Sequence, residues 1–168
     1  NYQLLLHKIH LSGPYIKSLT IQQLLAHTDI IPLLNEIYQL NSLNITYGRK
    51  NIGMRYHHNM YGIHEVDCSH LAQYLQLKTL ILSTLILQHN RIDNTLLSIL
   101  SYQGFQYNHS LTYVDLSFNN ISNLNLLTPL LKGNIIISLI LQDNNIGNSG
   151  DSGGENGENE EIQTQTYD

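Results

Sequence analysis

One spacing of aliphatic residues occurs three times in the second half of this chain. An eleven-residue frame has aliphatic side chains at positions 1, 4, 6 and 11 and an asparagine at position 9. The residues that fill it are Leu82, Leu85, Leu87, Asn90 and Ile92, then Leu111, Val114, Leu116, Asn119 and Ile121, and then Ile136, Leu139, Leu141, Asn144 and Ile146. Successive frames start 29 and then 25 residues apart. A frame that returns about every 20 to 29 residues indicates a repeat architecture.

Each frame predicts a short strand followed by a return segment. Positions 4 and 6 of a strand lie on the same face, so one row of aliphatic side chains points inward from every unit. The return segments 94–107 and 122–131 carry aliphatic residues at helical spacing, and Pro129 is expected to shorten the second helix. We therefore predict leucine-rich repeats: an α/β solenoid, or horseshoe, with parallel strands on the concave face and helices on the convex face.

The position-9 asparagines are the polar exceptions in this apolar frame. They are Asn90, Asn119 and Asn144. A buried amide must be hydrogen bonded, and the nearest partners are the backbone groups of the tight turn after each strand. The sequence therefore predicts a structural asparagine ladder.

The periodicity divides the chain into three parts. Residues 40–148 hold the repeats, including a degenerate one in which Leu40, Leu43 and Ile45 are followed by Gly48 where the asparagine is expected, and an insertion at 49–64. Residues 1–39 read as an N-terminal helical or degenerate repeat region, with a possible strand at 4–6 and a helical pattern over 21–38 that Pro32 interrupts. Residues 149–168 are an acidic, low-complexity segment, for which we expect a linker or tail.

Charge and cysteine usage limit the partners and the compartment. The formal net charge is −5, but residues 149–168 hold six acids and no Lys or Arg, which leaves seven acids against eight bases before them. A nearly neutral body lacks the basic face typical of nucleic-acid binding. Cys68 is the only cysteine, and no apolar run reaches the roughly 18 residues that cross a membrane. We expect a cytoplasmic protein that binds neither nucleic acid nor membrane.

The sequence gives little support for an enzyme. It contains no glycine-rich phosphate loop, dinucleotide fingerprint, HExxH helix or GxSxG elbow. One group of residues has ligand chemistry for zinc, but its spacing matches no standard site: His57, His58, His64, Asp67, Cys68 and His70. We therefore predict no catalytic residues, no cofactor and no metal.

What remains is a surface for binding other proteins. Outward positions of the predicted strands include several large apolar residues, and an exposed apolar patch usually marks an interaction site. The candidate protein-binding residues are Ile86, His89, Tyr113, Asp115, Phe118, Ile137 and Ile140. The alternative is that this patch packs against a neighbouring segment of the protein.

The insertion carries a family resemblance. Residues Tyr47, Gly48, Lys50, Gly53 and Met54, with a helix start at 67–68 and a repeat strand after it, resemble the leucine-rich-repeat subunit of the nexin-dynein regulatory complex, the T-complex-associated testis-expressed type. The repeats themselves are shared with ribonuclease-inhibitor-like proteins in general. The resemblance implies a non-enzymatic scaffold in the axoneme of motile cilia or flagella, bound to other subunits of a large hetero-complex. The alternatives are a cytoplasmic recognition module and a GTPase-activating protein for a Ran-type GTPase.

Overall fold

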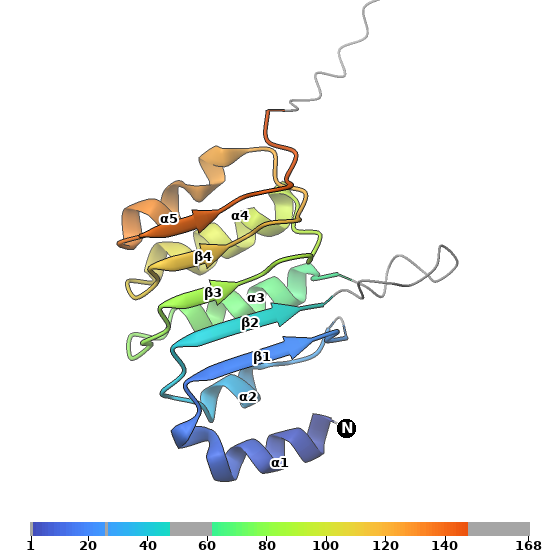
Figure 1. The fold of residues 1–168 in the computed structure, drawn as a ribbon, viewed down its shortest axis with the longest axis vertical. Helices are drawn as coiled ribbons and strands as arrows, with labels where there is room; N and C mark the ends of the chain where they lie inside the picture. The colour runs from blue at the N-terminus through green and yellow to red at the C-terminus, as the bar shows by residue number, and fades with distance from the viewer. Residues whose placement is uncertain (1, 26, 48–61, 148–168) are drawn as a thin grey trace, which may run out of the picture.

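The computed structural model describes residues 2–25, 27–47 and 62–147. It is an α/β fold around one five-stranded sheet in which every strand runs parallel to its neighbours. The strands lie side by side in chain order (Figure 1) and are β1 (Ser18–Gln22), β2 (Ser42–Thr46), β3 (Thr84–Ile86), β4 (Tyr113–Asp115) and β5 (Ser138–Ile140). Because parallel neighbours cannot be joined by a tight hairpin, the chain must return along the sheet after every strand.

The return segments form a helical layer on one side of the sheet, and no described residue covers the opposite face (Figure 1). With η denoting a 3-10 helix, the layer consists of α1 (Tyr2–Ser12), η1 (Gly13–Tyr15), α2 (Ile31–Asn35), α3 (Glu65–Leu75), α4 (Asn94–Gln103), η3 (Phe105–Tyr107), η4 (Leu124–Leu127) and α5 (Thr128–Gly133). None of the described helices is long and apolar enough to cross a membrane.

The strand register aligns the same frame position in all five units. Position 4 is occupied in turn by Leu19, Leu43, Leu85, Val114 and Leu139, which pair across the sheet. The interval between them is 24, 42, 29 and 25 residues, and the longest interval contains the residues 48–61. The strands therefore keep one register although the return segments differ in length.

The core lies between the sheet and the helical layer. Its inward strand residues are fully buried in the middle units, where Leu85, Leu87, Val114 and Leu116 are 0% exposed. Burying a side chain of this size contributes about 1.5–3 kcal/mol. At the two ends of the sheet, the corresponding residues of β1 and β5 are only partly buried. Each unit thus depends on a neighbour on both sides to complete its core.

The asparagines join consecutive units through the backbone. The Asn119 side-chain oxygen accepts hydrogen bonds from the backbone N–H groups of Asn90 and Ile92, both at 3.0 Å. Its amide nitrogen donates to the carbonyl oxygens of Leu87 and Leu116, both at 2.9 Å. Asn90 and Asn144 repeat the pattern: the former accepts from Tyr47 N–H and donates to Ile45 O, and the latter accepts from Ile121 N–H and donates to Leu116 O.

Two expectations for the N-terminal region are wrong. Residues 4–6 belong to helix α1 and not to a strand, because a short apolar run cannot be assigned by periodicity alone. The pattern over 21–38 is not one helix: β1 ends at Gln22, and α2 covers only Ile31–Asn35. Pro32 lies in the first turn of this helix, where its missing N–H and fixed φ are tolerated.

Pro129 has the same role in the last return segment. It stands in the first turn of α5, and the turn before it is the 3-10 helix η4. The expected shortening is therefore real, although the proline marks the beginning of the short helix and not a break late in a longer one.

We expect Asn119→Ala to lower the free energy of unfolding by about 3 kcal/mol, because it leaves buried N–H and C=O groups of two units without partners. Urea unfolding followed by circular dichroism measures this loss. Asn125→Ala is the matched control, since Asn125 is exposed and its side chain has no hydrogen bond in the described structure. Equal stability of the two variants would contradict the structural role of the ladder.

Candidate protein-interaction surface

Alternate strand residues point away from the helical layer and form the uncovered face of the sheet. The register arranges them in three rows, the third continuing just past the ends of the short strands: Ser18, Ser42, Thr84, Tyr113 and Ser138; Thr20, Asn44, Ile86, Asp115 and Ile140; Gln22, Thr46, Gln88, Ser117 and Gln142. Of these fifteen positions, Asp115 is the only one with a charged residue. The face is therefore built from hydroxyl, amide and a few apolar groups.

Four of the seven predicted binding residues lie together on this face. Ile86, Asp115 and Ile140 are register partners in the middle row, and Tyr113 lies beside them in the first row, between Thr84 and Ser138. Ile86, Tyr113 and Ile140 are each partly exposed. They give this half of the sheet an apolar character that the β1 and β2 half, with its Ser, Thr and Asn residues, does not have.

The sequence predicts an accessible Asp115 side chain on the outward face, whereas the structure buries it. It is only 3% exposed. Its Oδ1 accepts hydrogen bonds from the Ser117 N–H at 2.9 Å and the Ser117 hydroxyl at 2.7 Å, and its Oδ2 accepts from Gln88 Nε2. The carboxylate thus stabilises the turn after β4 and presents little area to a partner.

His89 and Phe118 form an aromatic pair where the strands end. Their ring centroids are 4.3 Å apart and their planes are nearly parallel, at 14°. Both residues have a left-handed backbone, with φ of 56°. A bulky residue seldom adopts this conformation, which costs free energy, and such residues gather at functional sites. Phe118 is 41% exposed, so the pair offers a free aromatic surface beside the sheet face.

Ile137 lies away from these residues. It precedes β5, at the opposite end of the strand from the aromatic pair, and its backbone N–H donates to Thr112 O at 2.8 Å. Its side chain is 82% exposed. It therefore belongs to the edge where strands begin and not to the sheet face.

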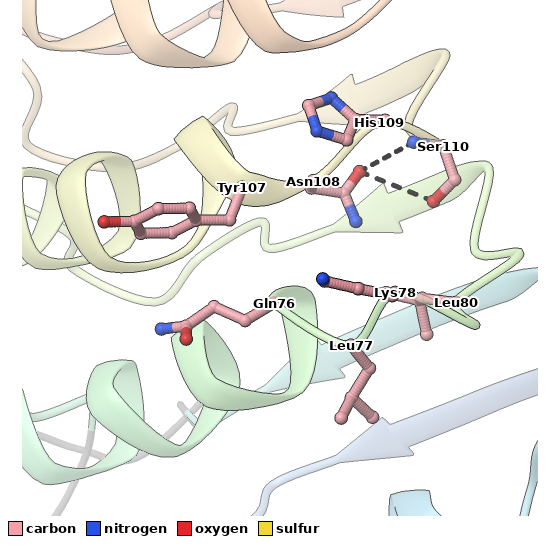
Figure 2. Close-up of a pocket in the computed structure, with 8 residues that line it drawn as sticks. All are labelled: Gln76, Leu77, Lys78, Leu80, Tyr107, Asn108, His109 and Ser110. Carbon is pink, nitrogen blue, oxygen red and sulfur yellow. Dashed lines mark hydrogen bonds between the residues drawn. The ribbon is translucent and has the colours of Figure 1, made fainter.

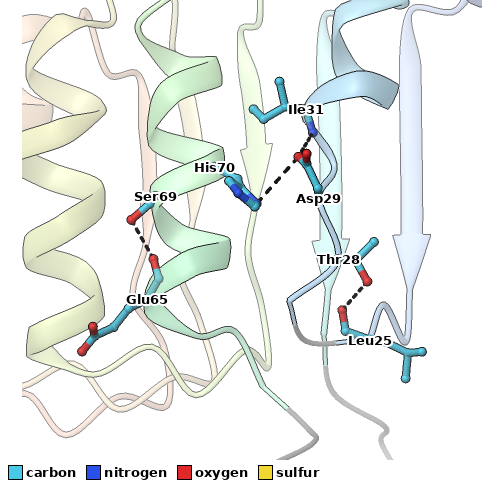
Figure 3. A network of polar contacts seen from close by, with 7 residues as sticks. All are labelled: Leu25, Thr28, Asp29, Ile31, Glu65, Ser69 and His70. Atoms are coloured by element: carbon cyan, nitrogen blue, oxygen red, sulfur yellow. Dashed lines mark hydrogen bonds and ion pairs between the residues drawn. The ribbon is translucent and has the colours of Figure 1, made fainter.

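Two of the residues considered for zinc binding, His64 and His70, contact neighbouring segments of the chain. His64 is the N-cap of α3: its side chain accepts from the Asp67 N–H, and its own N–H donates to Asp67 Oδ2 at 3.0 Å. His70 approaches Asp29 at 3.8 Å, and Asp29 in turn accepts from the N–H of Ile31 at the start of α2 (Figure 3). In the described ranges, no three His, Cys, Asp or Glu side chains gather as metal ligands. His57 and His58 lie outside the described residues.

Burial affects the ionisation of the two acidic groups of this cluster. It is the main cause that raises the pKa of Asp67, against the opposing effect of the backbone N–H groups and charges of His64 and His27. Asp67 is fully buried, and its Oδ1 has no hydrogen-bond partner. Burial also raises the pKa of the Cys68 thiol, and the nearby Asp67 carboxylate adds to the shift. The thiol therefore stays protonated at neutral pH, which is unsuited to nucleophilic attack.

We expect the Asp67→Asn variant to gain stability relative to the native chain as pH rises. A raised folded-state pKa means that the unfolded chain releases this proton first, so stability falls as pH rises above about 4. The asparagine does not titrate, and its side-chain oxygen can still accept from His64 N–H. Urea unfolding at several pH values between about 3 and 7 measures the difference. Glu65→Gln, which removes an exposed carboxylate from the same turn, is the control. A pH-independent difference for Asp67→Asn would contradict the buried-carboxylate interpretation.

Sequence reasoning missed the aromatic stack and one unit of the sheet. Ile16, Leu19, Ile21 and Leu24 have the spacing of the frame, with leucine in the asparagine position, so β1 could have been found by relaxing position 9. The stack had a weaker signal, because nothing in a single sequence shows that the residue before each asparagine is left-handed. The insertion, apart from residues 62–64, and the acidic segment 149–168 lie outside the described residues.

A scan against protein-family models gives no match for this chain, and a search of curated proteins gives none either.

Proposed function

We propose that this chain is part of a leucine-rich-repeat solenoid that binds other proteins through the uncovered face of its sheet and has no catalytic role. The observation that carries the proposal is the composition of that face. Fifteen outward positions hold one charged side chain, and that side chain is buried. Depletion of charge is the compositional mark of the centre of a protein–protein interface.

The distribution of apolar groups narrows the contact region. Ile86, Tyr113 and Ile140 are partly exposed on β3, β4 and β5, and the stacked rings of His89 and Phe118 adjoin them at the ends of the strands. Aromatic side chains surrounded by small polar groups are typical of interface anchors. In this proposal the partner contacts the β3–β5 half of the face, with Phe118 as the most exposed anchor.

The proposed setting is the axoneme, as a scaffold subunit of the nexin-dynein regulatory complex. Two features support this setting. Residues 47–54 resemble the insertion of that subunit in sequence, and the charge-poor face of the sheet suits a permanent structural contact. In this proposal the partners are other subunits of that complex.

Phe118→Asp should weaken rebinding of the chain to axonemes stripped of this subunit by at least about tenfold, since truncating an aromatic anchor commonly costs over 1.4 kcal/mol. The fold should persist, because aspartate adopts the left-handed conformation more readily than phenylalanine. Leu124→Asp, which changes a similarly exposed leucine in the helical layer, is the control. Co-sedimentation measures the binding. If both variants rebind like the native chain, the sheet face is not the contact.

Localisation tests the assembly itself. Demembranated cilia extracted with increasing salt should release this polypeptide together with dynein regulatory subunits. Its recovery in the detergent-soluble fraction, away from axonemes, would overturn the axonemal proposal and favour a free recognition module.

A further inference from the structure

The charged residues at the ends of α3, α4 and α5 differ in sign between the two edges of the sheet. Helices α3 and α4 begin at the edge where strands end, and Glu65, Asp67 and Asp93 lie at these helix starts. Lys78 and Lys132 lie at the opposite edge, in the turn after α3 and in the last turn of α5. Acids at helix N-termini and bases at helix C-termini complement the helix dipole, so this separation has a structural reason. It also creates a local surface with cationic groups and few acids.

That edge is hollowed in two adjoining places that share His109. One hollow, of about 620 Å³, lies between the turn after α3 and the turn after η3, with Leu77, Lys78 and Tyr107 in its wall. The other, of about 430 Å³, lies beside α5 and contains Tyr102 and Lys132. Figure 2 shows Lys78 extending from the lower turn, with Tyr107 and His109 on the upper one. The lining of neither hollow includes an Asp or Glu.

The walls of this groove are held by internal hydrogen bonds. Asn108 accepts from the N–H groups of Ser110 and Leu111, both at 3.0 Å, and donates to Leu75 O. His109 Nδ1 lies 2.8 Å from Gly133 O, and because a carbonyl only accepts, this nitrogen carries the proton. These bonds therefore hold the backbone around Asn108 and His109 in place.

The side chains that remain available are mostly donors. No hydrogen bond or ion pair in the described structure engages the amino groups of Lys78 and Lys132 or the hydroxyls of Tyr102 and Tyr107. Both tyrosines are at least half exposed, at 50% and 55%. The two lysine amino groups and the two exposed tyrosine rings suit a ligand that combines negative charges with atoms that can pack on the rings.

We propose that this groove, formed by Lys78, Tyr102, Tyr107, His109 and Lys132, binds an extended acidic peptide segment of a partner protein. The two lysines flank α4, so about two helix spacings of 8–10 Å separate them. An extended chain covers that span with roughly six residues at about 3.3 Å each. Carboxylates near both ends of such a segment pair with the lysines, and the side chains between them pack on the tyrosines.

A phosphate ligand fits the groove less well. Phosphates are held by converging N–H groups at helix N-termini or by clustered arginines, and neither hollow is lined by an arginine. Widely separated lysines suit carboxylates distributed along a peptide. The site is separate from the sheet face, so it would let a scaffold hold a second partner.

The test uses the full chain and a fluorescein-labelled hexaglutamate peptide, with a hexaglutamine peptide as control, followed by fluorescence anisotropy at low salt. We expect Lys78→Gln with Lys132→Gln to weaken hexaglutamate binding at least about tenfold, and the two Lys→Arg changes to preserve it. Lys8→Gln with Lys17→Gln removes the same charge from exposed sites outside the groove and should change binding by less than about twofold.

Four results would overturn the proposal. Equal binding of hexaglutamate and hexaglutamine would show that the groove does not recognise acidic side chains. An equal loss of binding in the two double Lys→Gln variants would show that only the net charge of the chain matters. Replacement of Glu155, Glu158, Glu160 and Glu161 by glutamine should leave binding unchanged; tighter binding would identify the chain's own acidic segment as the occupant.

Phe118→Asp should not affect binding of the hexaglutamate peptide, so failure of this proposal is distinguishable from failure of the proposed function. If the lysines serve only the helix dipole, their loss lowers the melting temperature and leaves peptide binding unchanged.

Discussion

The hydrogen bonds between asparagine side chains and the backbone of the preceding unit are the constraint on which the described structure depends. The turn after each strand leaves backbone N–H and C=O groups buried, and such groups are costly when unpaired. Asn90, Asn119 and Asn144 supply both a donor and an acceptor at that point. The same tight turn holds the residue before each asparagine in the left-handed conformation, and this is what brings His89 against Phe118.

The first unit satisfies the same requirement differently. It has Leu24 at the asparagine position, and the N–H of Leu24 donates to Thr46 O at 3.0 Å. A backbone bond of this kind joins the units without a buried amide. It also explains why an asparagine-based frame does not recognise β1, although the aliphatic positions of that strand are correct.

Sequence reasoning predicted the parallel strands of β3, β4 and β5 because their aliphatic residues repeat at fixed spacing. It also predicted a helix start at 67–68, which the structure places at Glu65. It failed where the signal was local: three leucines at 4–6 fit either a helix or a strand, and a proline can begin a helix as readily as end one. The surface was harder still. Asp115 occupies an outward position, yet Ser117 and Gln88 enclose its carboxylate, and a pattern of exposed and buried positions does not contain that side-chain contact.

The groove could not be predicted from one frame, because its residues come from helices and turns outside the frame. Lys78, His109 and Lys132 are 31 and 23 residues apart, and only the stacking of units brings them to one edge. Helix-dipole complementarity favours bases at helix ends in general, but it does not specify that two tyrosines lie between them.

The unequal return segments have an evolutionary consequence. The strand, with an asparagine in the turn after three of the five strands, forms the part of the unit that contacts its neighbours, whereas the intervals between strands vary from 24 to 42 residues without a change of register. New sequence can therefore enter a return segment while the ladder remains intact. Chains of this design can gain residues in that layer without a change of strand register, so the return segments and the outward side chains of the sheet can vary independently.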